Sequence, residues 1–341
     1  MNGLGAKPQQ AWTDLAAECE NAGLQPNVEN ILTRIRMKID AAGPSDEPLA
    51  MKPEELEQLG RTMRETIVKT ADVPDDLIPA DLPHARFATW VKSITRNMAI
   101  EVFTTNYDVL VERSLELRRV PVFDGFVGCY HPFFSPECME NEARLPDPST
   151  VRLWKIHGSI NWTVMREGNS ERVVRDGVSE QGLMILPSNR KYDESRQMPY
   201  VAMLDRLRTV LAQEPMVLVT CGFSFGDRHI NALLFEGLEN HPSTHVIALH
   251  HGPLDEAAYL ATTGSAYPNL IVIAENASVI GGKYDTWQHP NPLDETTATY
   301  VDLLFDTDTD GDGTRLLTGK MRAGDFSRLS TFLSSLQSAR S

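Results

Sequence analysis

Apolar residues recur along the chain with two different spacings, one typical of helices and the other typical of buried strands. Residues 8–42 predict two helices; in the second, isoleucine and leucine recur with a period of about 3.6 residues, and Gly43-Pro44 ends it. Residues 53–71 predict a further helix, with a proline in its first turn, acidic residues early and basic residues late. Residues 84–96 are predicted to be helical as well.

From residue 99 onward, short β-prone runs alternate with helical segments. The predicted strands are residues 99–105, 151–156, 216–220, 245–249 and 270–273. The run at 216–220 is continuously apolar, which is typical of a strand buried on both faces. Residues 162–187 predict a small β excursion, with glycine-containing turns at Glu167-Gly168-Asn169 and Asp176-Gly177. The alternation favours an α/β fold with a mostly parallel sheet and helices on both faces.

Composition narrows the class of protein. The 341 residues carry a formal net charge of −15. A surface that binds a nucleic-acid duplex must neutralise phosphates, for which an acidic protein is poorly suited. Contact with nucleic acid is therefore expected only through a partner. No run approaches the roughly 18–20 apolar residues that span a bilayer. The first residues also lack the apolar core of a signal peptide. We therefore expect no membrane contact and a cytoplasmic location.

The cysteines and histidines do not predict a metal site. The four cysteines are scattered without any C-x-x-C pair, which disfavours both a disulfide framework and a thiolate zinc site. The nine histidines include no pair at i and i+4 on a predicted helix beside a glutamate, as a zinc hydrolase motif requires.

Three loops that follow predicted strands carry the candidate chemistry: TTNYD (104–108), KIHGS (155–159) and TCGFSFGD (220–227). Ligands of an open parallel sheet bind beyond the carboxyl ends of its strands. Each loop alone has a structural explanation, because Asp108 stands at a helix N-cap position and His157 is typical of a hydrogen-bonded core histidine. The three loops together favour a shared site.

The strings FTTNYD, LWKIHGSINW and LVTCGFSFGDRHI resemble the sirtuin-like domain of bacterial defence NAD hydrolases. They are most similar to the branch that partners a HerA-type hexameric ATPase, and SNRKYDESRQMPY (188–200) and GDFSRLSTFLSSL (324–336) fit that branch. The resemblance implies a Rossmann-like domain over residues 1–290 with a helical insertion at about 26–97. Residues 291–341 are expected to form a C-terminal extension packed on the same domain.

The resemblance also implies roles for individual residues. Asn106 matches the asparagine that positions a water beside the nicotinamide ribose, and His157 matches the histidine that accepts a proton from a ribose hydroxyl or the water. Asp108 matches the acid that reads the nicotinamide carboxamide. The remaining expected contacts with NAD come from the same loops: Thr105, Gly158, Gly222, Ser224 and Asp227.

Two departures from the family pattern qualify these expectations. Sirtuin-like domains usually open with a strand and a glycine-rich loop that cradles phosphates, whereas here only Gly3 and Gly5 stand near the start and no strand is predicted before them. Deacetylating members carry a zinc module after the histidine motif, but residues 162–187 contain no cysteine, and Thr105 replaces their usual glutamine. NAD is therefore expected as a substrate, without zinc.

The leading hypothesis from the sequence is an NAD glycohydrolase that acts as the effector of an antiphage complex. It would form a homo-oligomer docked on the HerA-type ATPase. The alternative is a catalytically weak or inactive structural subunit, which the apparent absence of the first strand motivates. A nuclease subunit is a weaker alternative, since the chain is acidic and shows no cluster of metal-binding carboxylates.

Overall fold

The computed structural model describes residues 6–22, 26, 28–43, 46–168, 170–178, 183–184, 198–213, 215–288, 301, 303–309, 311–312 and 315–336. The candidate glycines Gly3 and Gly5, residues 188–197 and the expected domain boundary near residue 290 lie outside this part of the chain. Within it, no helix is both long and apolar enough to traverse a bilayer.

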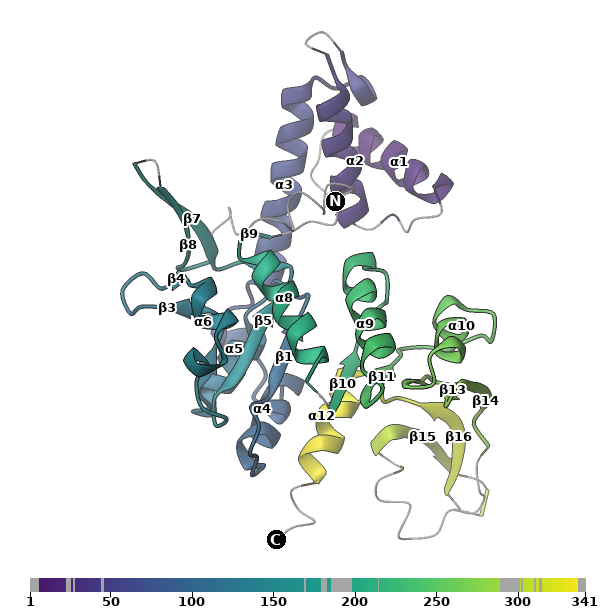
Figure 1. Cartoon of the computed structure of the whole chain (residues 1–341). Coiled ribbons are helices and arrows are strands. Elements are labelled where there is room, and N and C mark those ends of the chain that lie inside the picture. The colour runs from purple at the N-terminus through teal and green to yellow at the C-terminus, as the bar shows by residue number, and fades with distance from the viewer. Residues whose placement is uncertain are drawn as a thin grey trace.

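Three N-terminal helices form a separate layer, as Figure 1 shows at its top. They are α1 (Ala6–Asn21), α2 (Val28–Ala41) and α3 (Pro53–Ala71), with the 3₁₀ turns Pro48–Ala50 and Asp75–Leu77 in the connections. Their apolar stripes meet in a core of their own, because each helix is amphipathic. That core contains Ala11, Leu15, Cys19, Ile31, Leu32, Ile35, Met51, Leu56, Leu59 and Met63. The predicted helices are confirmed here.

The first parallel sheet has the strand order β1-β5-β2. Its strands are β1 (Glu101–Thr104), β5 (Val151–Lys155) and β2 (Val122–Phe123), and β1 pairs with β5 in the register Glu101↔Arg152. Phe103 and Trp154 face the helix α8 (Tyr200–Leu211), whereas Val102 and Val151 face α4 (Pro83–Ser93) and α5 (Leu110–Leu117). Both faces of this sheet are covered, as the sequence predicts.

The second sheet has the order β10-β11-β12-β13-β14. The strands β10 (Met216–Cys221), β11 (Thr244–Leu249) and β12 (Leu270–Ile273) are parallel, and β13 (Ala277–Ile280) and β14 (Lys283–Thr286) extend the sheet in antiparallel fashion. The helices α8, α9 (Arg228–Asn240) and α10 (Tyr259–Ala266) pack on one face through the largest apolar core. The α/β class with a parallel sheet is confirmed.

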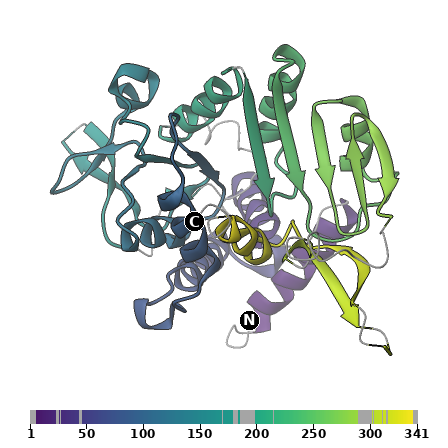
Figure 2. The same cartoon turned by 90° about the horizontal axis from the view of Figure 1, so that it is seen from below.

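The two sheets do not join into one. The strand β1 is the edge of the first sheet and β10 is the edge of the second, and no backbone pairing links them in the described residues. The helix α12 (Phe326–Ser335) lies between the sheets in the view of Figure 2 and packs against α4. The guanidinium of Arg86 on α4 donates to Ser327 Oγ at 2.9 Å, and the rings of His84 and Phe326 lie 5.1 Å apart.

Burial of β10 differs from the expectation. The side chains of Val217 and Val219 are 60% and 50% exposed, whereas Leu218 packs into the core under α9. An apolar run predicts burial on both faces only when elements cover both faces, but β10 is an edge strand with one uncovered face. The prediction that this strand is buried on both faces is wrong.

The remaining elements are short hairpins and turns. The strands β3 (Phe126–Val127), β4 (Phe133–Phe134), β8 (Ser170–Arg175) and β7 (Trp162–Glu167) form one small sheet, β6 (Gly158–Ser159) pairs with β9 (Leu183–Met184), and β15 (Phe305–Thr309) pairs with β16 (Arg315–Met321). The helix α6 (Pro136–Glu140) and a 3₁₀ turn (Glu142–Arg144) precede β5. The hairpin β7–β8 confirms the predicted β excursion after the histidine loop.

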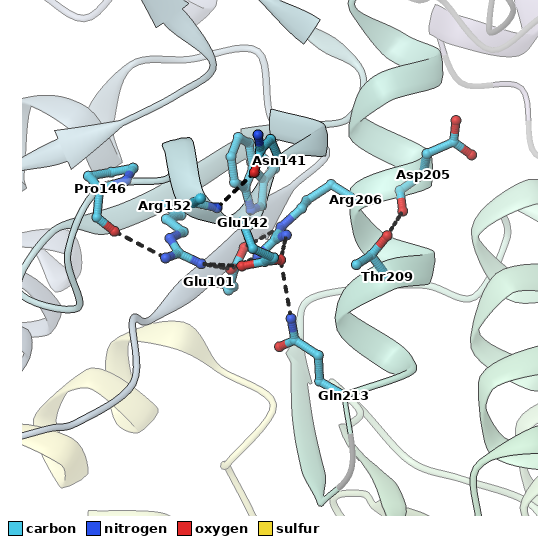
Figure 3. Close-up of polar contacts among 11 residues, drawn as sticks. Glu101, Asn141, Glu142, Pro146, Arg152, Asp205, Arg206, Thr209 and Gln213 are labelled. Atoms are coloured by element: carbon cyan, nitrogen blue, oxygen red, sulfur yellow. Dashed lines mark hydrogen bonds and ion pairs between the residues drawn. The ribbon is translucent and has the colours of Figure 1, made fainter. Parts of the chain in front are cut away.

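A buried ion network ties α8 to the first sheet (Figure 3). The guanidinium of Arg206, 4% exposed, donates to both carboxylate oxygens of Glu101, and Arg152 Nη1 donates to Glu101 Oε1 at 2.9 Å. Trp154 Nε1 donates to the same carboxylate, and Glu142 accepts from Arg206. Every charged side chain of this network has an oppositely charged partner, which offsets the cost of burial, although Arg152 Nε is buried without a hydrogen-bond partner among the described residues.

Candidate functional site

The first candidate loop follows β1 and is shaped by its own side chains. Thr104 Oγ1 accepts a hydrogen bond from the backbone N–H of Asn106 at 3.1 Å. Asp108 Oδ1 accepts from the backbone N–H of Leu110 at 2.9 Å. The N-cap of α5 is Val109, so the predicted cap position at Asp108 is one residue too early, although Asp108 still bonds the first helical N–H. The Asn106 side chain is exposed and Thr105 is half-buried.

The second loop, together with the last residue of β5, is hydrogen-bonded to the main chain of the first loop. The Lys155 side chain is 1% exposed, and its Nζ donates to the carbonyl oxygens of Tyr107 and Asp108. Ser159 Oγ donates to the carbonyl oxygen of Tyr107 at 3.4 Å, and Ile160 N–H donates to it at 3.1 Å. The loop that carries Asn106 and the loop that carries His157 are therefore bonded to each other.

Lys155 also makes a buried ion pair with Glu112 on α5. Its Nζ lies 2.9 Å from Glu112 Oε1, and the Glu112 side chain is 15% exposed. Burial raises the pKa of Glu112 above its ordinary value, and the Lys155 ammonium offsets part of that rise. Sequence reasoning overlooked this pair, although a lysine directly after the apolar residues Leu153 and Trp154 of a predicted strand was the available signal.

The third loop, after β10, meets the second through a direct side-chain contact. His157 Nε2 lies 3.0 Å from Asp227 Oδ2, and the two side chains are only 12% and 9% exposed. Asp227 is also the N-cap of α9, where its Oδ1 accepts from the backbone N–H groups of His229 at 2.9 Å and Ile230 at 3.3 Å. This contact links the carboxyl ends of the two separate sheets.

The backbone of the third loop adopts left-handed conformations at two positions. Gly222 has φ +71°, and a Cβ there would meet nothing within 4 Å, so conformation rather than crowding favours glycine. Phe225 has φ +54° although it is a bulky residue, and Asn231 Nδ2 bonds its carbonyl oxygen at 2.7 Å. Such strain costs about 1–3 kcal/mol and clusters at functional sites.

The other predicted contacts differ in accessibility. Gly222 and Ser224 are exposed, and Ser224 Oγ accepts from the backbone N–H of Gly226 at 3.3 Å, which is the turn-forming role. Gly158 is buried in β6 with φ +88°. The structure brings the three loops together, whereas the individual contacts with NAD stay predictions.

His84 on α4 is a neighbour of the site that the sequence did not reveal. Burial lowers the pKa of His84 below its ordinary value, and the nearby Asp108 carboxylate acts in the opposite direction. Its Nδ1 is buried without a hydrogen-bond partner among the described residues. No local motif marks His84, because it reaches the loop from a helix that precedes β1.

The described residues contain no group of three or more histidine, cysteine, aspartate or glutamate side chains arranged to hold a metal ion. A comparison with family models decides the class of the central region. Residues 100–267 match a SIR2-like domain. This SIR2-like domain begins just before β1, ends at α10 and contains all three candidate loops. A comparison with curated proteins gives no match.

The match confirms the predicted resemblance for the central region of the chain. Members of the SIR2-like family act on NAD, as deacylases or as NAD hydrolases, so the SIR2-like domain connects the three loops with NAD chemistry in general. The helices α1–α4 and α12 lie outside the matched residues. The assignment to a defence branch with an ATPase partner stays a prediction.

Proposed function

We propose that the chain is an enzyme that hydrolyses NAD at the bond between nicotinamide and ribose. The observation that carries the proposal is the convergence of three strand-end loops within the SIR2-like domain. They are joined through the bonds of Lys155 and Ser159 to the Tyr107 carbonyl and through the contact between His157 and Asp227. Shared clusters of polar groups at strand ends are the usual ligand site of such sheets.

The proposed roles follow from exposure and chemistry. Asn106, which is exposed, positions the attacking water beside the ribose, and the partly buried His157 accepts a proton. Asp108 recognises the carboxamide of nicotinamide. Thr105 and the main chain of Gly158, in the same loops, are further proposed contacts with NAD. The exposed Gly222 and Ser224 contact the adenosine side of the dinucleotide.

The reaction needs little acid catalysis. The pyridinium nitrogen takes the bonding electron pair and nicotinamide leaves as a neutral molecule, while the ribose develops oxocarbenium character. The protein must hold the ribose and place a water on its open face. A neutral histidine is suited to accept the proton of that water at cytosolic pH, since its unperturbed pKa is about 6.5.

Hydrolysis is favoured over deacylation by the segment after His157. The chain forms the hairpin β7–β8 there, and residues 162–187 contain no cysteine for the zinc module of deacetylating members. We therefore propose NAD as the substrate and no acyl-lysine substrate.

We further propose that the enzyme is the effector of an antiphage complex in the bacterial cytoplasm. It would form a homo-oligomer on a HerA-type hexameric ATPase, and NAD depletion would be its output. This part rests on the resemblance of FTTNYD, LWKIHGSINW and LVTCGFSFGDRHI to that branch and on the terminal segment 324–336, which forms α12.

A second candidate function is a structural subunit with weak or no catalysis. The division of the parallel strands into two sheets favours it, because β1 and β10 are both edge strands and no strand of the described residues joins them. A continuous sheet would hold the loops more rigidly than two sheets do.

The test is release of nicotinamide from NAD by the purified chain, alone and with the ATPase. Asn106→Ala and His157→Ala are expected to lower the rate by about 10²–10⁴-fold. Asn240→Ala and His245→Ala are matched controls, because both residues are exposed and lie outside the three loops. The melting temperature of each variant shows whether the fold is intact.

Two results would reject the proposal in different ways. A folded protein that releases no nicotinamide under either condition is not an NAD hydrolase. If Asn106→Ala and His157→Ala leave protection of cells against phage unchanged, the structural-subunit reading is correct. Loss of nicotinamide release in both site variants, with normal release in both controls, supports the catalytic reading.

A further inference from the structure

The carboxylate of Asp227 divides its two oxygens between two different elements. Oδ1 caps α9 by accepting from the N–H groups of His229 and Ile230, at 2.9 and 3.3 Å. Oδ2 lies 3.0 Å from His157 Nε2. A helix cap needs only one acceptor, as Asp325 shows at the start of α12, where a single oxygen accepts from Ser327 N–H at 2.7 Å. The contact with His157 is therefore additional to capping.

The chemistry of this contact determines which nitrogen of His157 carries its proton. An ionised carboxylate only accepts hydrogen bonds, so Nε2 must be the protonated nitrogen that donates to Asp227. In neutral imidazole the other nitrogen, Nδ1, then holds the lone pair. No hydrogen bond joins Nδ1 to another described residue. Both side chains are nearly buried, which strengthens the hydrogen bond between them.

We propose that Asp227 is a positioning residue that holds His157 in the Nε2–H tautomer and makes Nδ1 the proton acceptor. The inference rests on the proposed hydrolysis of NAD for its catalytic consequence. As the water oxygen bonds to C1′ of the ribose, the bond from C1′ to nicotinamide breaks and its electron pair leaves with nicotinamide. The proton of the water passes to Nδ1, and the Asp227 carboxylate stabilises the resulting imidazolium.

The deciding variant is Asp227→Asn, because asparagine caps helices as well as aspartate does. Its amide oxygen retains the bonds to the α9 backbone, while its NH₂ group takes the place of Oδ2 and donates to Nε2. His157 is then forced into the Nδ1–H tautomer. The ring nitrogens are read by ¹⁵N NMR of the full chain with labelled histidine, and the His157 signals are assigned from their loss in His157→Gln.

We expect the Nε2–H tautomer in the natural protein and the Nδ1–H tautomer in Asp227→Asn. For nicotinamide release we expect kcat to fall by about 10²–10⁴-fold with little change in KM, since the geometry is kept and the base is lost. Asp325→Asn is the matched control, because it alters a helix cap whose carboxylate has no hydrogen bond to a histidine ring in the part of the chain that the structure describes. It should change neither the His157 signals nor kcat.

The tautomer is measured without NAD, so its outcome is separate from that of the proposed function. An Nδ1–H tautomer in the natural protein, or unchanged His157 signals in Asp227→Asn, overturns the positioning role. If Asp227→Asn does not fold, Asp227→Ser keeps a cap and removes the contact. That variant should then show a mixture of tautomers, and a pure Nε2–H signal in it overturns the proposal.

Discussion

The lysine at the end of β5 illustrates how single residues hold the candidate site. Lys155 is almost completely buried, and it bonds both a carboxylate on α5 and the main chain of the loop that carries Asn106. Burying an ammonium group is costly unless it is paired and hydrogen-bonded. Lys155 therefore connects stability with the geometry of the loops.

Lys155→Met should lower the free energy of unfolding by about 3–5 kcal/mol, because Glu112 is left buried without its partner. The deficit should shrink as pH falls, since burial already raises the pKa of Glu112 and loss of the ammonium removes the charge that opposes this rise. Urea unfolding at several pH values measures both effects. Lys155→Met combined with Glu112→Leu should recover most of the loss, and a single variant as stable as the natural protein would contradict this account.

Cys221, at the end of β10, is expected to be an unreactive thiol. Burial and then the Asp325 carboxylate raise its pKa from 9.0 to about 11. Alkylation at pH 8, followed by peptide mass spectrometry, should modify the exposed Cys129 much faster than Cys221. Because folding raises this pKa, its contribution to stability is complete below pH 9 and is lost as pH rises toward 11. Equal alkylation of both thiols in the folded protein would contradict the prediction.

Among the elements, α12 has the most unexpected position. It comes from the C-terminal end of the chain but packs on α4 and lies between the two sheets (Figures 1 and 2). Gly324, which precedes the N-cap Asp325, lies so close to the residue after β11 that a Cβ would clash with the main-chain carbonyl of His250. The Gly324 carbonyl also contacts Cys221 Sγ at 3.4 Å. A glycine at this point therefore lets α12 approach the strand ends.

Gly324→Ala should destabilise the protein by about 1–3 kcal/mol, because backbone must shift to relieve the clash. Limited proteolysis should also cut near α12 more readily, since the helix moves away from α4. Gly177→Ala is the control, because a Cβ there meets nothing within 4 Å. It should change stability by less than about 0.5 kcal/mol. Equal stability of the two variants would show that α12 tolerates displacement.

At the scale of the whole molecule, two features bear on function: the net charge, and the division of the parallel strands into two sheets. The net charge of −15 opposes binding to another polyanion. The two sheets are connected at their carboxyl ends by His157 and Asp227, rather than by strand pairing. A small movement between the sheets would therefore alter the candidate site directly.

The purified chain is expected not to retard duplex DNA in a mobility-shift assay at physiological salt. The physical reason is repulsion between its acidic surface and the phosphates. The same assay with the ATPase present tests whether a partner supplies the contact. Retardation by the chain alone, weakening with added salt, would contradict the expectation that nucleic acid is reached only through a partner.

The amino-acid sequence alone determined which segments form helices and strands, and which three loops carry the candidate site residues. The helices at 53–71 and 83–93 and the strands β1, β5 and β10 follow from local sequence patterns, since helical and extended backbones repeat side chains at different intervals. The strings FTTNYD, LWKIHGSINW and LVTCGFSFGDRHI likewise identified the region that matches the SIR2-like domain. These features depend on residues that are close together in the sequence.

Only the tertiary structure decided how the elements meet. It divided the strands into two sheets and left one face of β10 exposed. It brought Lys155 Nζ into hydrogen-bond contact with the main chain of the loop that carries Asn106. It also joined His157 to Asp227 across 70 positions of sequence. Neither burial nor a hydrogen bond between distant residues is encoded by local spacing, because each depends on which surfaces remain after the helices and strands have packed.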